Sequence, residues 1–242
     1  MSFSHGKNTA VLVDKYNISA YLNEVSASQS IETAETSTFG TAAKTYITGQ
    51  NDATISFTGL YDGATDAIAE IFEAIISNDS TPPITICADG GLVVGSAATL
   101  AQAKQTSYEV AAPVSDVVSL SGEFQVTDGM RGGVLLAAAT AHTATTSGTS
   151  VDGSASSALG ARANLHVTAN TRSATTVIKV QHSADNSTWA DLITFTTVAS
   201  TTLTSETATA TGTVNRYLRA TTTIASGTGS ITYTLSLSRR SN

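Results

Sequence analysis

The sequence predicts a mainly β protein with one packed α-helix, and three observations lead to this prediction. Apolar and polar residues alternate with a period of two along most regular segments, as in strands that bury one face. One segment alone has the 3.6-residue period of an amphipathic helix. The chain has 242 residues, which is long enough for two β domains with cores of their own. We therefore expect an N-terminal antiparallel β-sandwich or barrel with one packed helix, followed by a C-terminal antiparallel β-sandwich.

Four alternating runs build the first domain, which we expect at residues 1–140. Each run sets an apolar face against a face of Ser, Thr, Gln and carboxylates. In the third run, for example, Tyr108 and Val110 oppose Gln105 and Glu109. The four runs are residues 22–33, 51–60, 105–110 and 117–126.

One helix is expected near residues 64–78, between the second and third runs. Asp62, Asp66 and Glu70 lie where the cap and the first turns of a helix favour carboxylates. Two prolines, the second of them Pro83, end the helix and lead into a further strand. The apolar stripe of this helix, which the apolar sheet face can cover, consists of Ile68, Ile71, Phe72 and Ile75.

Small, nearly uncharged residues predict a flexible linker at 141–160. The second domain, at 161–242, alternates again without a helical period, which predicts a small antiparallel sandwich. Its single tryptophan, Trp189, is expected to anchor the core. The strands expected there are 163–168, 175–183, 189–196, 215–224 and 230–238.

The sequence carries no recognisable catalytic or metal site, and we expect no enzyme, no metal and no cofactor. The four histidines lack the spacing of metal ligands, and there is neither a nucleophile elbow nor a P-loop. Cys87 is the only cysteine and lies in an apolar run, so we expect a buried small hydrophobic residue. No apolar segment is long enough to suggest a membrane span.

Charge is sparse and unevenly distributed along the chain. Residues 1–140 have a net charge of −10 and residues 141–242 a net charge of +3, which argues against tight binding to nucleic acid. The predicted polar faces carry carboxylates but no Lys or Arg, whereas an ordinary solvent face mixes both signs. This pattern predicts a hydrated surface that does not adhere to a polyanion. The carboxylates are Glu24, Glu32, Asp52, Glu109 and Glu123.

Residues 8–138 resemble the major tail tube protein of long-tailed (siphovirus-type) bacteriophages. The resemblance is carried by TAVLVD and NISAYLNEVSASQSIETAETSTFGTAAKTYITG, by NDATISFTGLYDG before the helix, and by the closing SLSGEFQVTDG. The second domain is similar to the Ig-like or jelly-roll decoration modules that such proteins carry on the outside of the tube.

This resemblance implies a structural virion protein that forms hexameric rings stacked into a tube, through which DNA passes into the host without specific binding. It implies self-assembly, together with contacts to tape-measure and tail terminator or initiator proteins, in a virion made in the host cytoplasm. The five carboxylates would then line the lumen, where they repel DNA phosphates.

The resemblance also gives a role to the connector near residues 34–50, which contains almost no aliphatic side chain. In a tube it becomes a long hairpin arm that stays soluble in the monomer and is ordered by a neighbouring subunit or ring. Its apolar residues are expected to anchor the arm, and its lysine to be free to pair with the neighbour's carboxylates. The contact residues expected are Phe39, Gly40, Lys44, Tyr46 and Ile47.

Two other functions stay open at the level of sequence. A carbohydrate-binding or adhesion module would use the second domain, with Trp189, Tyr217 and Arg219 as a glycan platform. A capsid decoration protein would form small oligomers and no filaments.

Overall fold

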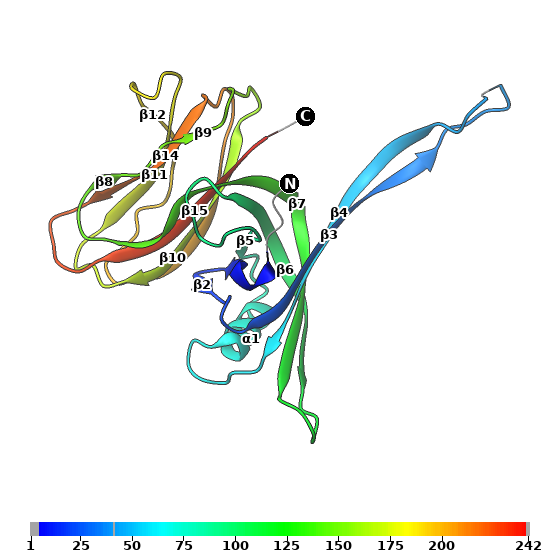
Figure 1. Cartoon of the computed structure of the whole chain (residues 1–242), viewed down its shortest axis with the longest axis horizontal. Helices are drawn as coiled ribbons and strands as arrows, with labels where there is room; N and C mark the ends of the chain where they lie inside the picture. Colours follow the sequence, from blue (N-terminus) through cyan, green and yellow to red (C-terminus); the bar gives the residue numbers. More distant parts are fainter. Residues whose placement is uncertain (1–4, 41, 241–242) are drawn as a thin grey trace. The chain divides into compact units, whose positions relative to one another are not determined.

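The protein is mainly β, with antiparallel sheets and one α-helix within the part of the chain that the structure describes. This structure, a computed structural model, describes residues 5–40 and 42–240 (Figure 1). No helix in those residues is long and apolar enough to span a membrane. The chain forms two compact units, which are discontinuous in sequence. Unit 1 comprises residues 1–20, 82–100 and 131–242, and unit 2 comprises residues 21–81 and 101–130.

This division differs from the expected domains at 1–140 and 161–242. Two long strands, β6 (Ala97–Ala111) and β7 (Ser119–His142), run through both units. The larger sheet therefore has ten strands, in the order β13-β10-β15-β7-β6-β5-β1-β2, and β4 pairs with β7 and with β3. A compositional change near residue 150 does not reveal strands that continue through both units.

Unit 2 is built around the sheet order β3-β4-β7-β6, with α1 (Ile68–Ser77) packed against one face. β3 (Leu22–Glu35) and β4 (Tyr46–Leu60) are longer than the predicted runs and form the expected hairpin. Figure 1 shows this hairpin as a long two-stranded ribbon that extends well beyond α1. The predicted arm is thus a continuation of two strands, closed by a turn.

Three aromatic rings hold the helix on the sheet of unit 2. Phe72 of α1 lies 5.4 Å from Phe124 of β7 and 6.1 Å from Phe57 of β4, measured between ring centroids. The Phe72 and Phe124 rings meet edge to face at 72°, the geometry that aromatic quadrupoles favour. Gly122 lies beneath Phe72, where an added Cβ would come within 2.7 Å of the ring. The predicted apolar stripe of the helix is buried, as expected.

The helix begins at Ile68, later than the predicted start near 64. Asp66 has a φ of 60°, so the chain cannot be helical there. The Glu70 carboxylate accepts a hydrogen bond from the Asp66 N–H at 2.8 Å, and the N-cap residue Ala67 makes no side-chain cap. The first-turn carboxylate of Glu70 replaces the cap that Asp62 or Asp66 was expected to supply.

Unit 1 contains a β-sandwich whose core lies between two sheets. One layer is formed by β13, β10, β15 and the second half of β7, and the other by β12, β11, β14 and the short β8 and β9. Aliphatic side chains from both layers, with Phe195 and Tyr233, form one buried cluster. The strands of this part are β8 (Thr146–Ser147), β9 (Val151–Asp152), β10 (Ala161–Asn170), β11 (Thr176–Ser183), β12 (Ala190–Thr194), β13 (Thr204–Ala210), β14 (Tyr217–Ile224) and β15 (Ile231–Arg239).

Residues 141–160, expected to be a flexible linker, contain two short strands. β8 and β9 both pair with β14, so small polar residues here form the edge of a sheet. The Thr-rich β13 was also not anticipated, because its Thr and Ala residues give no clear alternation of apolar and polar side chains.

The remaining elements of unit 1 are the 3-10 helix η1 (Gly6–Asn8), β1 (Ala10–Val13), β2 (Tyr16–Asn17) and β5 (Pro83–Cys87). A buried hydrogen-bonded network joins these strands to the sandwich through His166 of β10. The His166 Nδ1 lies 2.5 Å from the backbone oxygen of Asp14, which can only accept, so Nδ1 carries the proton. Nε2 then accepts from the Thr85 hydroxyl at 2.8 Å, and Ser236 completes the chain 3.1 Å from Thr85. Burial lowers the pKa of His166 to about 4.

We predict that His166 makes unit 1 sensitive to acid. An unfolded histidine has a pKa of about 6.5, so between pH 6.5 and pH 4 the unfolded chain binds a proton that the folded chain excludes. Stability should therefore fall as pH is lowered through this window, by up to roughly 3 kcal/mol, and this contribution should level off below pH 4. Urea unfolding of wild type and His166→Gln at a series of pH values measures this loss. The free energy of unfolding of the variant should lack the His166 contribution to its decrease between pH 6.5 and pH 4. The exposed His5→Gln is the control, and identical slopes in wild type and His166→Gln would contradict the assignment.

Candidate assembly surfaces of unit 2

The strand register of unit 2 gathers hydroxyls, amides and carboxylates on the sheet face that lies opposite the aromatic core. Residues directly opposite one another across antiparallel strands share a face. Two links reinforce the pairing: the Ser28 and Thr54 hydroxyls lie 2.9 Å apart, and Gln125 donates to Asp52. The rows across β3, β4 and β7 are Glu24, Thr58 and Ser121; Ser26, Ser56 and Glu123; Ser28, Thr54 and Gln125; and Ser30 with Asp52.

None of the residues in these rows of β3, β4 and β7 is basic, and the register brings three of the predicted carboxylates onto one face. Glu24 and Glu123 belong to neighbouring rows but are separated by β4, which corresponds to two strand spacings or roughly 9–10 Å. They are exposed on an open sheet face and do not form a hydrogen-bonded acid–base pair. Such a surface repels anions and holds water, and it offers no enclosed reaction site.

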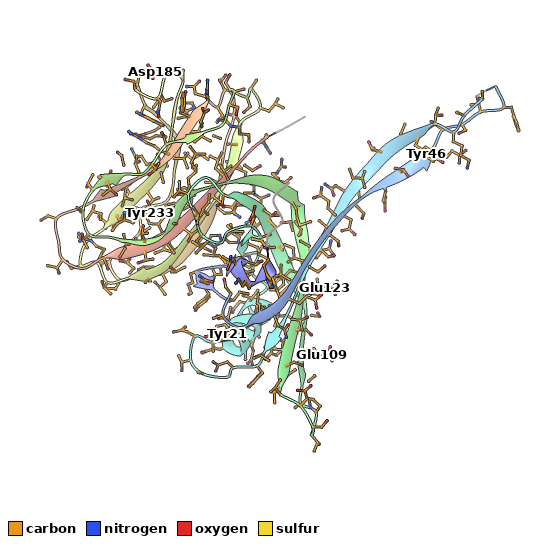
Figure 2. The ribbon with its side chains drawn as sticks, in the orientation of Figure 1. Tyr21, Tyr46, Glu109, Glu123, Asp185 and Tyr233 are labelled. Carbon is orange, nitrogen blue, oxygen red and sulfur yellow. The ribbon has the colours of Figure 1, made fainter. Side chains whose placement is uncertain are left out.

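The other two predicted carboxylates are also exposed. Glu32 lies in β3 beside a register shift, with its side chain next to Gly49 of β4. Figure 2 shows Glu109 further along the β6–β7 ribbon than Glu123, toward its tip. Gln105, expected on the polar face with Glu109, is buried. Gln105 and Glu109 are four residues apart, so strand alternation puts their side chains on the same face. The burial of Gln105 therefore removes the sequence argument that placed Glu109 among the polar rows.

On the other face, the core does not extend to β3. Ile55 of β4 and Phe124 of β7 are completely buried, but their row partner on β3, Ala27, is exposed. Ile31, four residues further along β3 than Ala27, is 52% exposed. The apolar positions of β3 therefore alternate as predicted, yet nothing within unit 2 covers most of them.

The sheet of unit 2 also has two incompletely paired edges. In the part of the chain that the structure describes, β4 is the one strand that pairs with β3, so the other side of this 14-residue strand is open. At the opposite edge β6 is 15 residues long, and its outer neighbour β5 has 5 residues. Unpaired N–H and C=O groups on such edges readily pair with another strand.

The arm ends in a hydrogen-bonded turn with exposed apolar side chains. The Thr36 N–H donates to the Thr45 oxygen at 2.8 Å, and the Thr45 N–H donates to the Ser37 hydroxyl at 3.0 Å. Phe39 is fully exposed, with a relative accessibility of 114%. Tyr46, labelled far along the ribbon in Figure 2, and Ile47 are more than half exposed, and Gly40 is exposed as well.

Lys44 already has one partner within its own chain. Its ammonium donates to the Glu35 carboxylate at 3.0 Å, across the hairpin. Glu35 is the last residue of β3, and Lys44 lies two residues before β4, so the closing turn brings them side by side. The Lys44 side chain nevertheless stays 68% exposed, and a lysine ammonium has three donors.

A second apolar projection, which the sequence analysis missed, lies in the turn between β6 and β7. Val114 has a relative accessibility of 109% and Val117 of 62%. The Val117 N–H donates to the Asp116 carboxylate at 2.7 Å, which shapes the turn. The available signal was the run AAPVSDVV, where Pro, Ser and Asp mark a turn and the valines within it have no strand partner.

The proposed glycan platform of unit 1 is differently arranged from what the sequence suggested. Trp189 is half-buried and is not a core residue, because it precedes β12 at the outer surface of the sheet. The Arg219 guanidinium lies 4.1 Å from the centroid of the Trp189 ring, and Arg216 lies 5.0 Å from that of Tyr217. Both aromatic residues therefore already have a guanidinium over one ring face, and a sugar could stack on that face only by displacing it.

Burial holds Cys87 in place, and an ion pair holds Asp152. Among the described residues there is no group of three or more His, Cys, Asp or Glu side chains able to hold a metal ion. Cys87 is buried, and burial raises the pKa of its thiol to about 11, which keeps it protonated and unreactive. The Arg216 hydrogen bonds lower the pKa of Asp152 to about 2, consistent with a surface ion pair.

Several solved structures are similar in fold. A chain in the virion of a native gene transfer agent particle is 18% identical, with 53% of this chain and 97% of that chain covered and a TM-score of 0.45. The SPP1 tail tube is 13% identical over 53% and 77%, with a TM-score of 0.44. The SPP1 Dit protein is 15% identical over 93% and 98%, with a TM-score of 0.36. No family model and no curated protein matches the chain.

Proposed function

We propose that the chain is a structural virion subunit whose copies close into hexameric rings and stack into a phage tail tube. The tube serves as a conduit through which DNA passes into the host without specific binding. Its partners are other copies of the same chain, tail terminator or initiator proteins at the ends of the tube, and a tape-measure protein inside it. The protein is made in the host cytoplasm and resides in the virion.

The observation that carries this proposal is the open β3 edge with its uncovered apolar positions. Pairing β3 of one copy with the free part of β6 on the next satisfies both edges at once. The two edge strands run antiparallel in this arrangement, because the strands alternate in direction across β3-β4-β7-β6. Since the two edges differ, the contact is heterologous and closes into a ring rather than a two-fold dimer.

Six copies give a barrel of suitable width. With four strands per copy, a strand spacing of ~4.8 Å and a tilt of roughly 40°, the backbone of the closed barrel is about 50 Å across. This leaves room for a DNA duplex after inward side chains are included. Three copies would halve the diameter and leave no such passage.

The polar rows are placed inward in this barrel, because α1 and the aromatic core occupy the other face of the sheet. Ring symmetry multiplies each of the row carboxylates Glu24, Asp52 and Glu123 sixfold. Their charge repels phosphates over a Debye length of about 8 to 10 Å, and the Ser and Thr hydroxyls keep the wall hydrated. DNA then slides past the wall instead of adhering to it.

We predict that the purified protein forms hollow tubes or stacked rings with sixfold cross-section under negative-stain electron microscopy. A map of these tubes should place the polar rows, marked by Glu123 and Asp52, on the lumen wall. Persistent monomers across a range of protein and salt concentrations would contradict the tube proposal. Small closed oligomers without filaments would favour a capsid decoration protein, and these carboxylates on an outer wall would contradict the lumen assignment.

The arm gives a second prediction. Because Phe39 is fully exposed in the chain, Phe39→Ala should leave the free energy of unfolding within about 0.5 kcal/mol of wild type. It should nevertheless reduce the mass of assembled tubes at least tenfold, because burying a Phe side chain contributes about 1.5–3 kcal/mol at every subunit contact. Sedimentation separates tubes from free subunits.

Two variants serve as controls for this experiment. Phe39→Leu retains an apolar anchor and should assemble, and Val93→Ala removes an exposed apolar side chain of unit 1 without effect on assembly. Normal tubes from Phe39→Ala, or an unfolded Phe39→Ala subunit, would make the arm an ordinary loop.

A further inference from the structure

The turn between β6 and β7, residues 112–118, presents apolar side chains in an ordered frame. Pro113 fixes one side of the turn, and the Asp116 carboxylate accepts the Val117 N–H at 2.7 Å. The Tyr61 N–H donates to the Val118 oxygen at 3.0 Å and joins the end of the turn to the segment that follows β4. Val114 projects from this frame with its side chain fully exposed. An exposed apolar tip on a fixed frame is typical of a contact surface.

Topology places this turn and the arm at opposite ends of the unit 2 sheet. β3 and β7 are both antiparallel to β4, so they run in the same direction. β7 begins at the 112–118 turn, and β3 ends in the arm. Figure 1 shows the two projections at opposite ends of the same set of strands.

We propose that the 112–118 turn of one copy is the docking site for the arm tip of a copy in the adjacent ring. This inference rests on the proposed tube and identifies the surface that receives the arm. Rings that stack with the same polarity bring the arm end of one sheet against the turn end of the next. A heterologous contact of this kind uses two different surfaces on each copy and extends without closing, as a tube requires.

The side chains on the two surfaces are chemically complementary. The arm offers Phe39 and the half-exposed Ile47, and the turn offers Val114 and Val117. Neither set has an apolar partner within its own chain large enough to bury it, so contact removes apolar area from water on both sides.

Charge is complementary as well. Lys44 uses one of its donors for Glu35 and keeps an exposed ammonium, and Asp116 is the exposed carboxylate of the turn. One Lys44 can therefore bridge its own Glu35 and the Asp116 of the copy that it meets.

Cysteine crosslinking in assembled protein tests the contact. Gly40 lies beside the arm tip, and a Cβ added there would meet no atom within 4 Å; Ser115 lies beside Val114 and is exposed. The double variant Gly40→Cys/Ser115→Cys is assembled under reducing conditions and then oxidised or treated with a short bismaleimide. The native Cys87 can stay, because it is buried and its thiol pKa is raised to about 11.

We expect a ladder of dimers, trimers and higher species in denaturing gels, because each copy carries both halves of the contact. Gly40→Cys alone, and Gly40→Cys/Ser187→Cys with its second thiol in a turn of unit 1, should show no ladder. Tubes without a 40–115 ladder would overturn the docking site while leaving the tube proposal intact. Absence of tubes in the wild-type protein would instead overturn the proposed function on which the inference rests.

A charge variant gives an independent test. Val114→Asp should unfold as wild type does, since the side chain is fully exposed, but should lose at least tenfold in tube mass and accumulate free rings or subunits. Val114→Leu should assemble normally. Undiminished tubes from Val114→Asp would overturn the docking site.

Discussion

An antiparallel sheet that ends on a long unpaired strand leaves a row of N–H and C=O groups without partners, and this constraint governs the architecture of unit 2. β3 is such a strand: fourteen residues, one partner, and apolar positions that α1 does not reach. The aromatic contact of Phe72 with Phe57 and Phe124 fixes the helix over β4 and β7. The cover therefore stops short of the edge, and in the proposed ring a neighbouring copy covers the rest.

In the proposed tube, the two faces of the unit 2 sheet have different roles, one in assembly and the other in DNA passage. On one face the core ends before it reaches β3. On the other face the rows across β3, β4 and β7 line up hydroxyls and carboxylates, and no residue of these rows is basic. In the proposed ring, this second face forms the inner wall. The arm and the 112–118 turn project from the two ends of the sheet, where they give each copy in the proposed tube two different surfaces for stacking.

Much of this could be predicted from the sequence, because periodicity depends on local residues alone. The alternation in β4 and β7 and the stripe of α1 placed Phe57, Phe124 and Phe72 in the core correctly. Features that depend on tertiary contacts could not be predicted in the same way. Gln105 alternates like a surface residue but is buried, and Trp189 lies at the surface, where Arg219 covers one face of its ring.

Long-range organisation was the least predictable part of the fold. Residues 141–160 have the composition of a linker, yet β8 and β9 pair with β14, which lies some seventy residues later. The sequence predicted part of the candidate surface. Alternation placed Glu24, Asp52 and Glu123 on one face, and composition indicated the arm. The Lys44–Glu35 pair and the exposed Val114 depend on how hairpins close, which a period of two does not specify.

Amide hydrogen exchange along β3 tests the central claim most directly, namely that this edge strand pairs with another copy. In the free subunit, the alternate amides of Leu22–Glu35 that point away from β4 should exchange rapidly, while those bonded to β4 are protected. On assembly, the outward amides should become protected together with those on the free part of β6. Outward β3 amides that exchange as fast in assembled protein as in the free subunit would contradict edge pairing, and with it the ring.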